Sequence, residues 1–228
     1  MIKPVFFKGI IHFNNIISDE THRIRIIPEG PFTFEPGQFV TITVAPMVKR
    51  SYSIASLPGL DYIDLIGDVR AGGPGSQFFS SAKEGQGVEV LGPLGLFTFK
   101  ETARSVIFWA TGTGVVPFIS MVESVLVNNP DKPLILNSSF KFEKDIFGQD
   151  IFEDIVIRYQ NFTYNLFVSR PEADWKGKSG RVTEYFKELK KPKDYDHYMC
   201  GVKPMVEEVL AKLIELGVDA GQIHYEKY

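Results

Sequence analysis

The chain has 228 residues, of which 44% are hydrophobic and 23% are charged, an ordinary composition for a globular protein of one large or two small domains. The net charge is −3 and no basic run stands out, so nucleic acid and anionic membranes are not expected as partners. The single cysteine, Cys200, excludes a disulfide framework and a protein-bound iron–sulfur cluster, and the four histidines lack metal-ligand spacing, so no metal site is expected.

The first half of the chain has the pattern of short strands and turns. Residues 1–13 interrupt their apolar run with charged and polar side chains, unlike a signal peptide or a spanning helix, so a cytoplasmic protein is expected. Alternating apolar and polar side chains mark strands at 21–29, 37–46, 61–70 and 85–95. One short helix is expected from Ser76 to Ala82. Strands spaced about ten residues apart and separated by glycine-rich turns predict an antiparallel barrel.

The pattern changes at Arg104, where strands begin to alternate with helices. The continuous apolar run 104–110 predicts a strand buried on both faces. Further strands are expected at 132–139, 162–170, 195–201 and 222–228, and helices at 115–129, 145–158, 181–190 and 203–217. This alternation predicts a doubly wound parallel sheet. The boundary falls near 99–105, which divides the chain into domains of residues 1–100 and 101–228.

Two segments of the first domain have the composition of a ligand edge. In the segment 49–56, Arg50 offers a planar fork suited to phosphate, Tyr52 a flat face for a ring, and Ser53 a hydroxyl and an amide N–H. The alternative is an edge strand with a solvated arginine. In the segment 71–79, glycines precede an expected helix start that favours an anion. The alternative there is a plain turn with Ser76 as the helix N-cap.

Two segments of the second domain also suggest binding. Residues 110–118 place a Gly-x-Gly turn between a buried strand and a helix, which is the phosphate-binding position of a doubly wound sheet. The alternative is tight helix–strand packing without a ligand. Arg170, at the end of another strand, is a candidate for a basic pocket with Arg181 and Lys178. The alternative is a set of solvated surface cations. Cys200 lies at the end of a further strand, where a cysteine is ordinarily a small buried hydrophobe. The functional alternative is a polarizable atom beside a reactive ring.

Taken together, these motifs resemble the ferredoxin–NADP⁺ reductase superfamily across nearly the whole chain. The matching motifs, in order, are Arg50-Ser-Tyr52-Ser53-x-x-Ser56, "GGPGS", "GPLGLF", "TGTG", "CGVKPM" and a final "EKY". The resemblance implies a two-domain β plus α/β fold. It consists of a six-stranded antiparallel Greek-key barrel that holds FAD, followed by a doubly wound domain that binds NAD(P)H.

The resemblance also implies roles for residues of the first domain. Arg50 would bind the flavin pyrophosphate, Tyr52 would pack on the isoalloxazine, and Ser53 would hydrogen-bond near flavin N5. Gly75 and Ser76 would present amides to the phosphate. The residues implied for FAD are Arg50, Ser51, Tyr52, Ser53, Gly75 and Ser76.

In the second domain, the resemblance assigns residues to the nicotinamide nucleotide. The pyrophosphate turn comprises Thr111, Gly112, Thr113 and Gly114. Cys200 and Gly201 would lie beside the nicotinamide. Ser169 and Arg170, helped by Arg181, resemble a 2′-phosphate site, so NADP(H) is favoured over NAD(H). Lys141 stands where the family often has an arginine and cannot make the same bidentate contact.

The last residues match the family's glutamate and terminal aromatic. Tyr228 would stack on the flavin face that the nicotinamide must occupy, and Glu226 would lie near the nicotinamide or relay a proton. The catalytic residues implied are Ser53, Cys200, Glu226 and Tyr228.

The resemblance implies a monomeric flavoprotein oxidoreductase that moves hydride between NAD(P)H and FAD. Without a cysteine-rich cluster domain, its electrons would pass to a separate acceptor such as ferredoxin, flavodoxin or the ferredoxin of an oxygenase. One alternative is a free-flavin or ferric reductase, and another is a non-catalytic flavin- or nucleotide-binding subunit. The lysine-rich segment 187–193 could dock an acidic partner, although a solvated helix end is the simpler interpretation.

Overall fold

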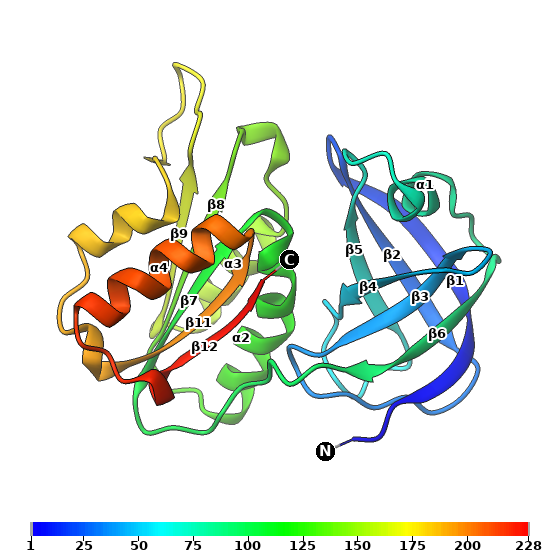
Figure 1. Cartoon of the computed structure of the whole chain (residues 1–228), viewed down its shortest axis with the longest axis horizontal. Helices are drawn as coiled ribbons and strands as arrows, with labels where there is room; N and C mark the ends of the chain where they lie inside the picture. Colours follow the sequence, from blue (N-terminus) through cyan, green and yellow to red (C-terminus); the bar gives the residue numbers. More distant parts are fainter. Residues whose placement is uncertain (1, 228) are drawn as a thin grey trace. The chain divides into compact units, whose positions relative to one another are not determined.

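The computed structural model describes residues 2–227, which divide into two compact units (Figure 1). The first unit comprises the residues up to Phe99 together with Val116–Ser124. The second comprises Lys100–Val115 and the residues from Val125 onward. Each unit contains one six-stranded sheet.

The sheet of the first unit is antiparallel throughout. Its strands are β1 (Val5–Ser18), β2 (Thr21–Pro28), β3 (Phe39–Ala45), β4 (Val48–Ser53), β5 (Ile63–Asp68) and β6 (Gly87–Leu94). They lie in the order β4-β3-β6-β1-β2-β5, and an isolated bridge between Ile54 and Leu65 links the two edges. This arrangement confirms the predicted six-stranded antiparallel fold of the first half.

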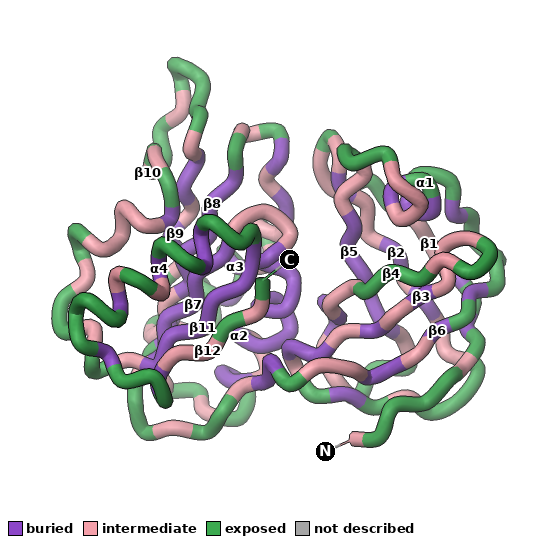
Figure 2. The backbone as a smooth tube through the Cα atoms, in the orientation of Figure 1, coloured by how far each residue is buried: buried purple, intermediate pink, exposed green. Residues whose placement is uncertain are grey.

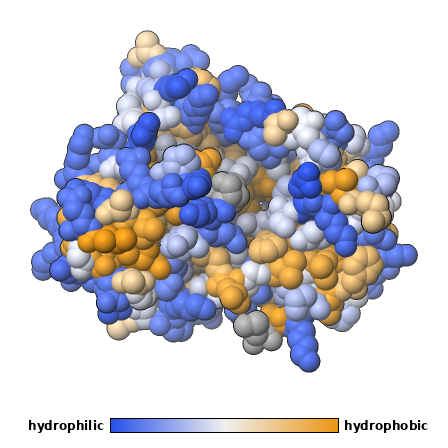
Figure 3. Space-filling view, viewed as in Figure 1, coloured by the Kyte–Doolittle hydropathy of each residue, from blue (hydrophilic) through white to orange (hydrophobic). Residues whose placement is uncertain are grey.

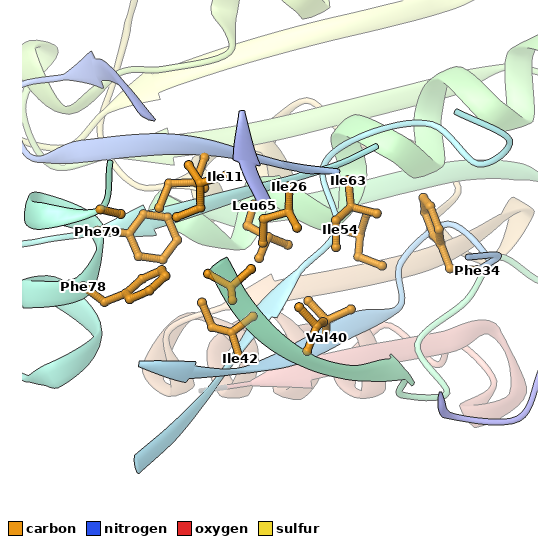
Figure 4. Close-up of a cluster of buried hydrophobic side chains, with 14 residues drawn as sticks. Ile11, Ile26, Phe34, Val40, Ile42, Ile54, Ile63, Leu65, Phe78 and Phe79 are labelled. Carbon is orange, nitrogen blue, oxygen red and sulfur yellow. The ribbon is translucent and has the colours of Figure 1, made fainter. Parts of the chain in front are cut away.

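Alternation along the strands fills the core of this unit. Ile24 and Ile26 of β2 and Val40 and Ile42 of β3 are all fully buried, as the sequence pattern predicts. Helix α1 (Pro74–Ser81) adds two phenylalanines to the same cluster, and Figure 4 shows one of them, Phe79, beside the core isoleucines. The helix begins two residues earlier than expected because proline, with its fixed φ, suits the first helical position.

A buried carboxylate on β5 lies where the two edges of the sheet meet. The side chain of Asp64 on β5 is 2% exposed and forms ion pairs with Arg23 and Arg25 of β2. The Arg25 guanidinium also lies 3.5 Å from the Tyr62 ring centroid. The main chain of Asp64 donates to Ser56 Oγ over 3.2 Å and accepts from the Ala55 N–H over 2.8 Å. The ion pairs therefore hold β5 against β2, and the main-chain hydrogen bonds hold it against the segment that follows β4.

The sheet of the second unit is parallel, as predicted. Its strands are β7 (Ser105–Thr111), β8 (Leu134–Phe140), β9 (Phe162–Val168), β10 (Lys178–Ser179), β11 (Tyr195–Gly201) and β12 (Ile223–Lys227). They lie in the order β10-β9-β8-β7-β11-β12. The chain leaves β7 toward β8 on one side and later returns to β11 on the other, so the topological switch point lies between β7 and β11.

The helices of the parallel sheet follow its strands. The α-helices are α2 (Val116–Asn128), α3 (Gln149–Arg158) and α4 (Lys203–Glu215). The 3₁₀ segments are η1 (Gly112–Val115), η2 (Glu143–Asp145), η3 (Val182–Lys187), η4 (Pro192–Asp194) and η5 (Ala220–Gln222). Helix α4 covers the sheet face that contains Trp109 and Met199, and the strands beneath it are buried (Figure 2). Within residues 2–227, no helix is long and apolar enough to cross a membrane.

The helix expected over 181–190 is wrong in type and length. The chain forms the 3₁₀ segment η3 over Val182–Lys187 instead. Val182 and Tyr185 are spaced three residues apart, and both pack against the cluster around Trp109, a spacing that a 3₁₀ turn places on one face. The two-residue strand β10 was not expected, because so short a pairing has no sequence pattern.

A buried histidine connects two strands of the second unit. The Trp109 indole N–H lies 3.3 Å from His197 Nδ1, so this nitrogen accepts. His197 Nε2 therefore carries the proton and donates to the Pro192 carbonyl over 2.9 Å. Burial lowers the pKa of His197 to about 4. The ring is consequently neutral at physiological pH.

This lowered pKa predicts acid sensitivity. The unfolded chain binds a proton at His197 near pH 6.5, whereas the folded protein resists it until about pH 4. The contribution of neutral His197 to the free energy of unfolding is therefore fully present above pH 6.5. It falls as the pH drops toward 4, by up to about 1.4 kcal/mol per pH unit. Urea unfolding at pH 7 and pH 5 should show a steeper loss for the wild type than for His197→Gln. Equal losses would exclude His197 as the source.

Candidate functional site

Strand β4 places the two largest predicted flavin-site residues on one face. Arg50 pairs with Ile42 and Tyr52 pairs with Val40, so both lie on the sheet face that the core residues share. Ser51 pairs with Thr41 on the other face, and their hydroxyl oxygens are 3.0 Å apart.

A glycine brings the second predicted loop against the first. A Cβ atom at Gly75 would lie 2.4 Å from Tyr52 Oη and 3.4 Å from Arg50 Cγ. A side chain at this position would collide with the tyrosine, so only glycine allows the approach. The structure thus brings Gly75 and the 50–53 strand together, although 22 residues or more separate them in the sequence.

The start of α1 is open to an anion. Its N-cap is Gly73, and no side chain caps the helix. The Gln77 N–H donates to the Gly73 carbonyl over 2.9 Å, so the amides of Gly75 and Ser76 precede this bond. The Ser76 hydroxyl donates to the Asp68 carbonyl over 3.2 Å, so the alternative of Ser76 as N-cap is wrong. Amides at a helix start, which have no partner within the helix, form a site suited to phosphate.

Tyr52 presents a neutral ring at this site. Its ring lies 4.8 Å from that of Phe79, tilted by 54°. Burial raises the pKa of Tyr52 to about 12, against a smaller lowering by Arg50. Arg50 itself is exposed, with Nη1 donating to the Lys49 carbonyl over 2.8 Å. Ser53 ends β4 opposite Phe39 and is half-buried.

In the second unit, the glycine turn after β7 touches the end of β11. A Cβ at Gly114 would lie 2.1 Å from the Cys200 carbonyl oxygen, and one at Gly201 would lie 2.3 Å from Thr111 Oγ1. The Val202 N–H donates to the same Thr111 oxygen over 3.2 Å. Thus the structure brings Thr111 and Gly114 of the turn against Cys200 and Gly201 at the strand end, beside the switch point.

The glycines of this turn do not all have the same explanation. The contacts of Gly114 are explained by tight packing of the turn against the neighbouring strand, without a ligand. Gly112 differs, because its φ is +53° and no atom lies within 4 Å of the position its Cβ would occupy. Open space in front of a left-handed glycine at a strand end suits the approach of a ligand. Thr113 lies between the two, within η1.

The predicted catalytic residues of the second unit lie on neighbouring strands. Cys200 is fully buried and pairs in register with Ala110 on one side and Glu226 on the other. Burial raises the pKa of the half-buried Glu226. The other residue expected here, Tyr228, lies outside the described residues.

The predicted 2′-phosphate residues line one pocket. It has a volume of about 620 Å³, and its walls include Lys141, Ser169, Arg170 and Arg181. Backbone bonds place two of them, because the Ser169 N–H donates to the Phe140 carbonyl and the Arg170 N–H to the Lys141 carbonyl, both over 2.9 Å. The surface at this end of the unit is largely hydrophilic (Figure 3).

Two features of the pocket differ from the sequence-based expectation. Lys178 is not among its lining residues, because its Nζ forms an ion pair with Glu188 at 2.8 Å. Two acidic residues that sequence reasoning missed, Glu184 and Glu208, do line it. No local signal identifies Glu208, since only the packing of α4 brings it close to the end of β9.

Comparisons with known proteins agree with this geometry. The oxidoreductase FAD-binding domain family matches residues 9–99, and the oxidoreductase NAD-binding domain family matches residues 108–210. Among solved structures, an Amycolatopsis cytochrome P450 reductase superposes with a TM-score of 0.92 at 23% identity, covering 98% of this chain and 70% of that one. A ferredoxin NADP⁺ reductase from Neisseria gonorrhoeae with bound FAD and NADP gives 0.85 at 20% identity, covering 97% and 98%. These likenesses show the fold.

Sequence relatives define the family. The electron transfer component of toluate 1,2-dioxygenase from Pseudomonas putida is 33% identical over 86% of this chain, which spans only 59% of that protein. Ferredoxin–NADP reductase B from Sorangium cellulosum (strain So ce56) is 34% identical, with 86% of each chain covered. The chain therefore belongs to the ferredoxin–NADP⁺ reductase superfamily and carries its FAD-binding and NAD-binding domains.

Proposed function

We propose that this protein is a flavoprotein oxidoreductase that moves hydride from NAD(P)H to FAD and passes the electrons to a separate acceptor. The observation that carries the proposal is the contact of Gly75 with Tyr52 and Arg50, which joins an anion-binding helix start to an aromatic ring. FAD has both a pyrophosphate and a flat ring system. The proposed domains are residues 1–100 for FAD and 101–228 for the nicotinamide nucleotide.

The residues of the first unit fit FAD. Arg50 is exposed and offers a bidentate fork to the pyrophosphate. The amides of Gly75 and Ser76 supply further donors. Tyr52, neutral up to about pH 12, packs its ring on the isoalloxazine. Ser53 donates to the flavin near N5, and Ser51 supports the strand through Thr41.

The residues of the second unit fit a nicotinamide nucleotide. Amides of the turn from Thr111 to Gly114 bind its pyrophosphate at the switch point. Cys200 and Gly201 end the neighbouring strand and position the nicotinamide ring. The two cofactors, when bound, supply hydride transfer and stepwise electron release. Glu226, whose raised pKa favours holding a proton, relays it near this ring.

We propose that the protein prefers NADP(H) over NAD(H), and the pocket beyond β9 supports this preference. Arg170 and Arg181 offer planar guanidinium groups, and Lys141 adds a point charge. A 2′-phosphate gains from such cations, whereas a free 2′-hydroxyl does not.

We infer that the acceptor is a ferredoxin or flavodoxin, including the ferredoxin of an oxygenase. Support comes from the relatives, several of which are named as reductase or electron transfer components of oxygenase systems. We further propose a cytoplasmic monomer. The exposed lysines at 190, 191 and 193 offer a basic surface for an acidic partner.

The first test is spectroscopic. The purified protein, supplied with FAD, should be yellow and should bleach when NADPH is added without oxygen. Ferricyanide or ferredoxin should then restore the colour. A protein that takes up no FAD, or that binds FAD but is not bleached by either nucleotide, would overturn the proposed function and would favour a non-catalytic subunit. Rapid release of the flavin after reduction would instead indicate a free-flavin reductase.

The role of Gly75 makes a second prediction. Gly75→Ala places a methyl group 2.4 Å from Tyr52 Oη and should displace the ring, which weakens FAD binding by about tenfold or more. The matched control is Gly73→Ala, because no atom lies within 4 Å of that Cβ position. Titration of both apoproteins with FAD, followed by fluorescence quenching, measures the difference. Equal affinities would remove Gly75 from the site.

The role of Arg170 makes a third prediction. Arg170→Ala should weaken binding of NADPH by about tenfold while leaving binding of NADH nearly unchanged, because the lost contact is to the 2′-phosphate alone. Lys178→Ala is the control, since this cation is paired with Glu188 away from the pocket. Stopped-flow flavin reduction with both nucleotides separates the two effects. Equal loss with NADH would show that Arg170 binds another part of the nucleotide.

A further inference from the structure

The pocket that the proposed function assigns to the 2′-phosphate also contains an acidic residue bound to one of its arginines. Glu208 of α4 lies with Oε2 at 3.4 Å from Arg181 Nη1. Its other oxygen, Oε1, accepts a hydrogen bond from Thr183 Oγ1 over 3.0 Å. Both carboxylate oxygens are therefore engaged, and the Arg181 guanidinium is turned toward α4.

The second acidic residue of the pocket is in a different situation. Glu184 forms an ion pair with Lys187, which is not among the residues that line the pocket. Its Cγ would lie 2.9 Å from a Cβ at Gly180, so it packs closely on that glycine. Lys187 thus compensates the charge of Glu184, whereas the charge of Glu208 is compensated by the same arginine that a phosphate would use.

The two nucleotides place opposite demands on Glu208. A 2′-phosphate must draw Arg181 away from the carboxylate and then tolerate a negative charge close by. A 2′-hydroxyl is a hydrogen-bond donor, and a carboxylate is the group that accepts from it in NAD-binding sites. Glu208 therefore opposes the first ligand and suits the second.

We propose that Glu208 is a specificity-determining residue that limits the preference for NADP(H) and keeps NAD(H) usable. This inference rests on the proposed function, because it assumes that the pocket holds the 2′ position of the nucleotide. Arg170 and Lys141 attract the phosphate. Glu208 determines how strongly Arg181 contributes to this attraction, because the carboxylate competes with the phosphate for the Arg181 guanidinium.

The solvent exposure of Arg181 and Glu208 determines how strongly Glu208 can affect the affinity for a 2′-phosphate. The side chains of Arg181 and Glu208 are 76% and 46% exposed, so water and salt screen their interaction. Removal of the negative charge should therefore change the affinity for a 2′-phosphate by about fivefold, less than the effect of deleting Arg170. The change should shrink as ionic strength rises.

The test uses Glu208→Gln, which removes the charge but keeps an oxygen that accepts from Thr183. Calorimetric titration of the FAD-loaded protein with 2′-phospho-AMP and with AMP measures the pocket directly. The variant should bind 2′-phospho-AMP about fivefold more tightly and AMP no more tightly than the wild type. The ratio of flavin reduction rates with NADPH and NADH should rise in parallel.

The matched control is Glu207→Gln on the same helix. Glu207 pairs with Lys203 and Lys227 and is not among the residues that line the pocket, so its neutralisation should leave the ratio unchanged. An unchanged ratio in Glu208→Gln, with tight binding of 2′-phospho-AMP by the wild type, would overturn the role of Glu208 while leaving the proposed function intact. Failure of the wild type to bind either nucleotide would overturn both.

Discussion

Each candidate site depends on a glycine whose neighbour lies closer than any side chain at that position would allow. At Gly75 the neighbour is the Tyr52 hydroxyl, and at Gly114 it is the carbonyl of Cys200. In each case the glycine belongs to a turn that opens a helical segment, so the same contact that locks the turn in place also sets the direction of its amides. Phosphate recognition by backbone N–H groups requires that direction to be fixed before the ligand arrives.

The two units offer different groups to a negatively charged ligand. In the first unit, the amides at the start of α1 lie beside the side chain of Arg50. The pocket beyond β9 mixes three cations with Glu184 and Glu208. The interaction of backbone amides with a phosphate cannot be altered without moving the backbone. The charge of a side chain, in contrast, changes with a single substitution. Discrimination between nucleotides therefore falls to the mixed pocket, and general phosphate binding falls to the turns.

The features of this structure that can be predicted from the sequence are those that a local pattern of residues determines. The buried run before Thr111 and the strand 195–201 were identified because apolar runs and alternation directly reflect burial. The type of η3 was missed because its three-residue period is imposed by packing on Trp109. Lys178 was placed in the pocket because its charge is visible in the sequence, whereas its pairing with Glu188 is not. Glu208 was missed because charge balance between distant segments has no sequence signature.

The closure of the first sheet links its core to its candidate cofactor site. β4 is paired with β3, and the residues that follow it reach β5 through the bridge between Ile54 and Leu65 and the bond from the Ala55 N–H to the Asp64 carbonyl. Ile54 is fully buried, and the Tyr52 ring packs against the same hydrophobic core. Core packing and cofactor affinity are therefore coupled in this unit, so a substitution far from the ligand can change both.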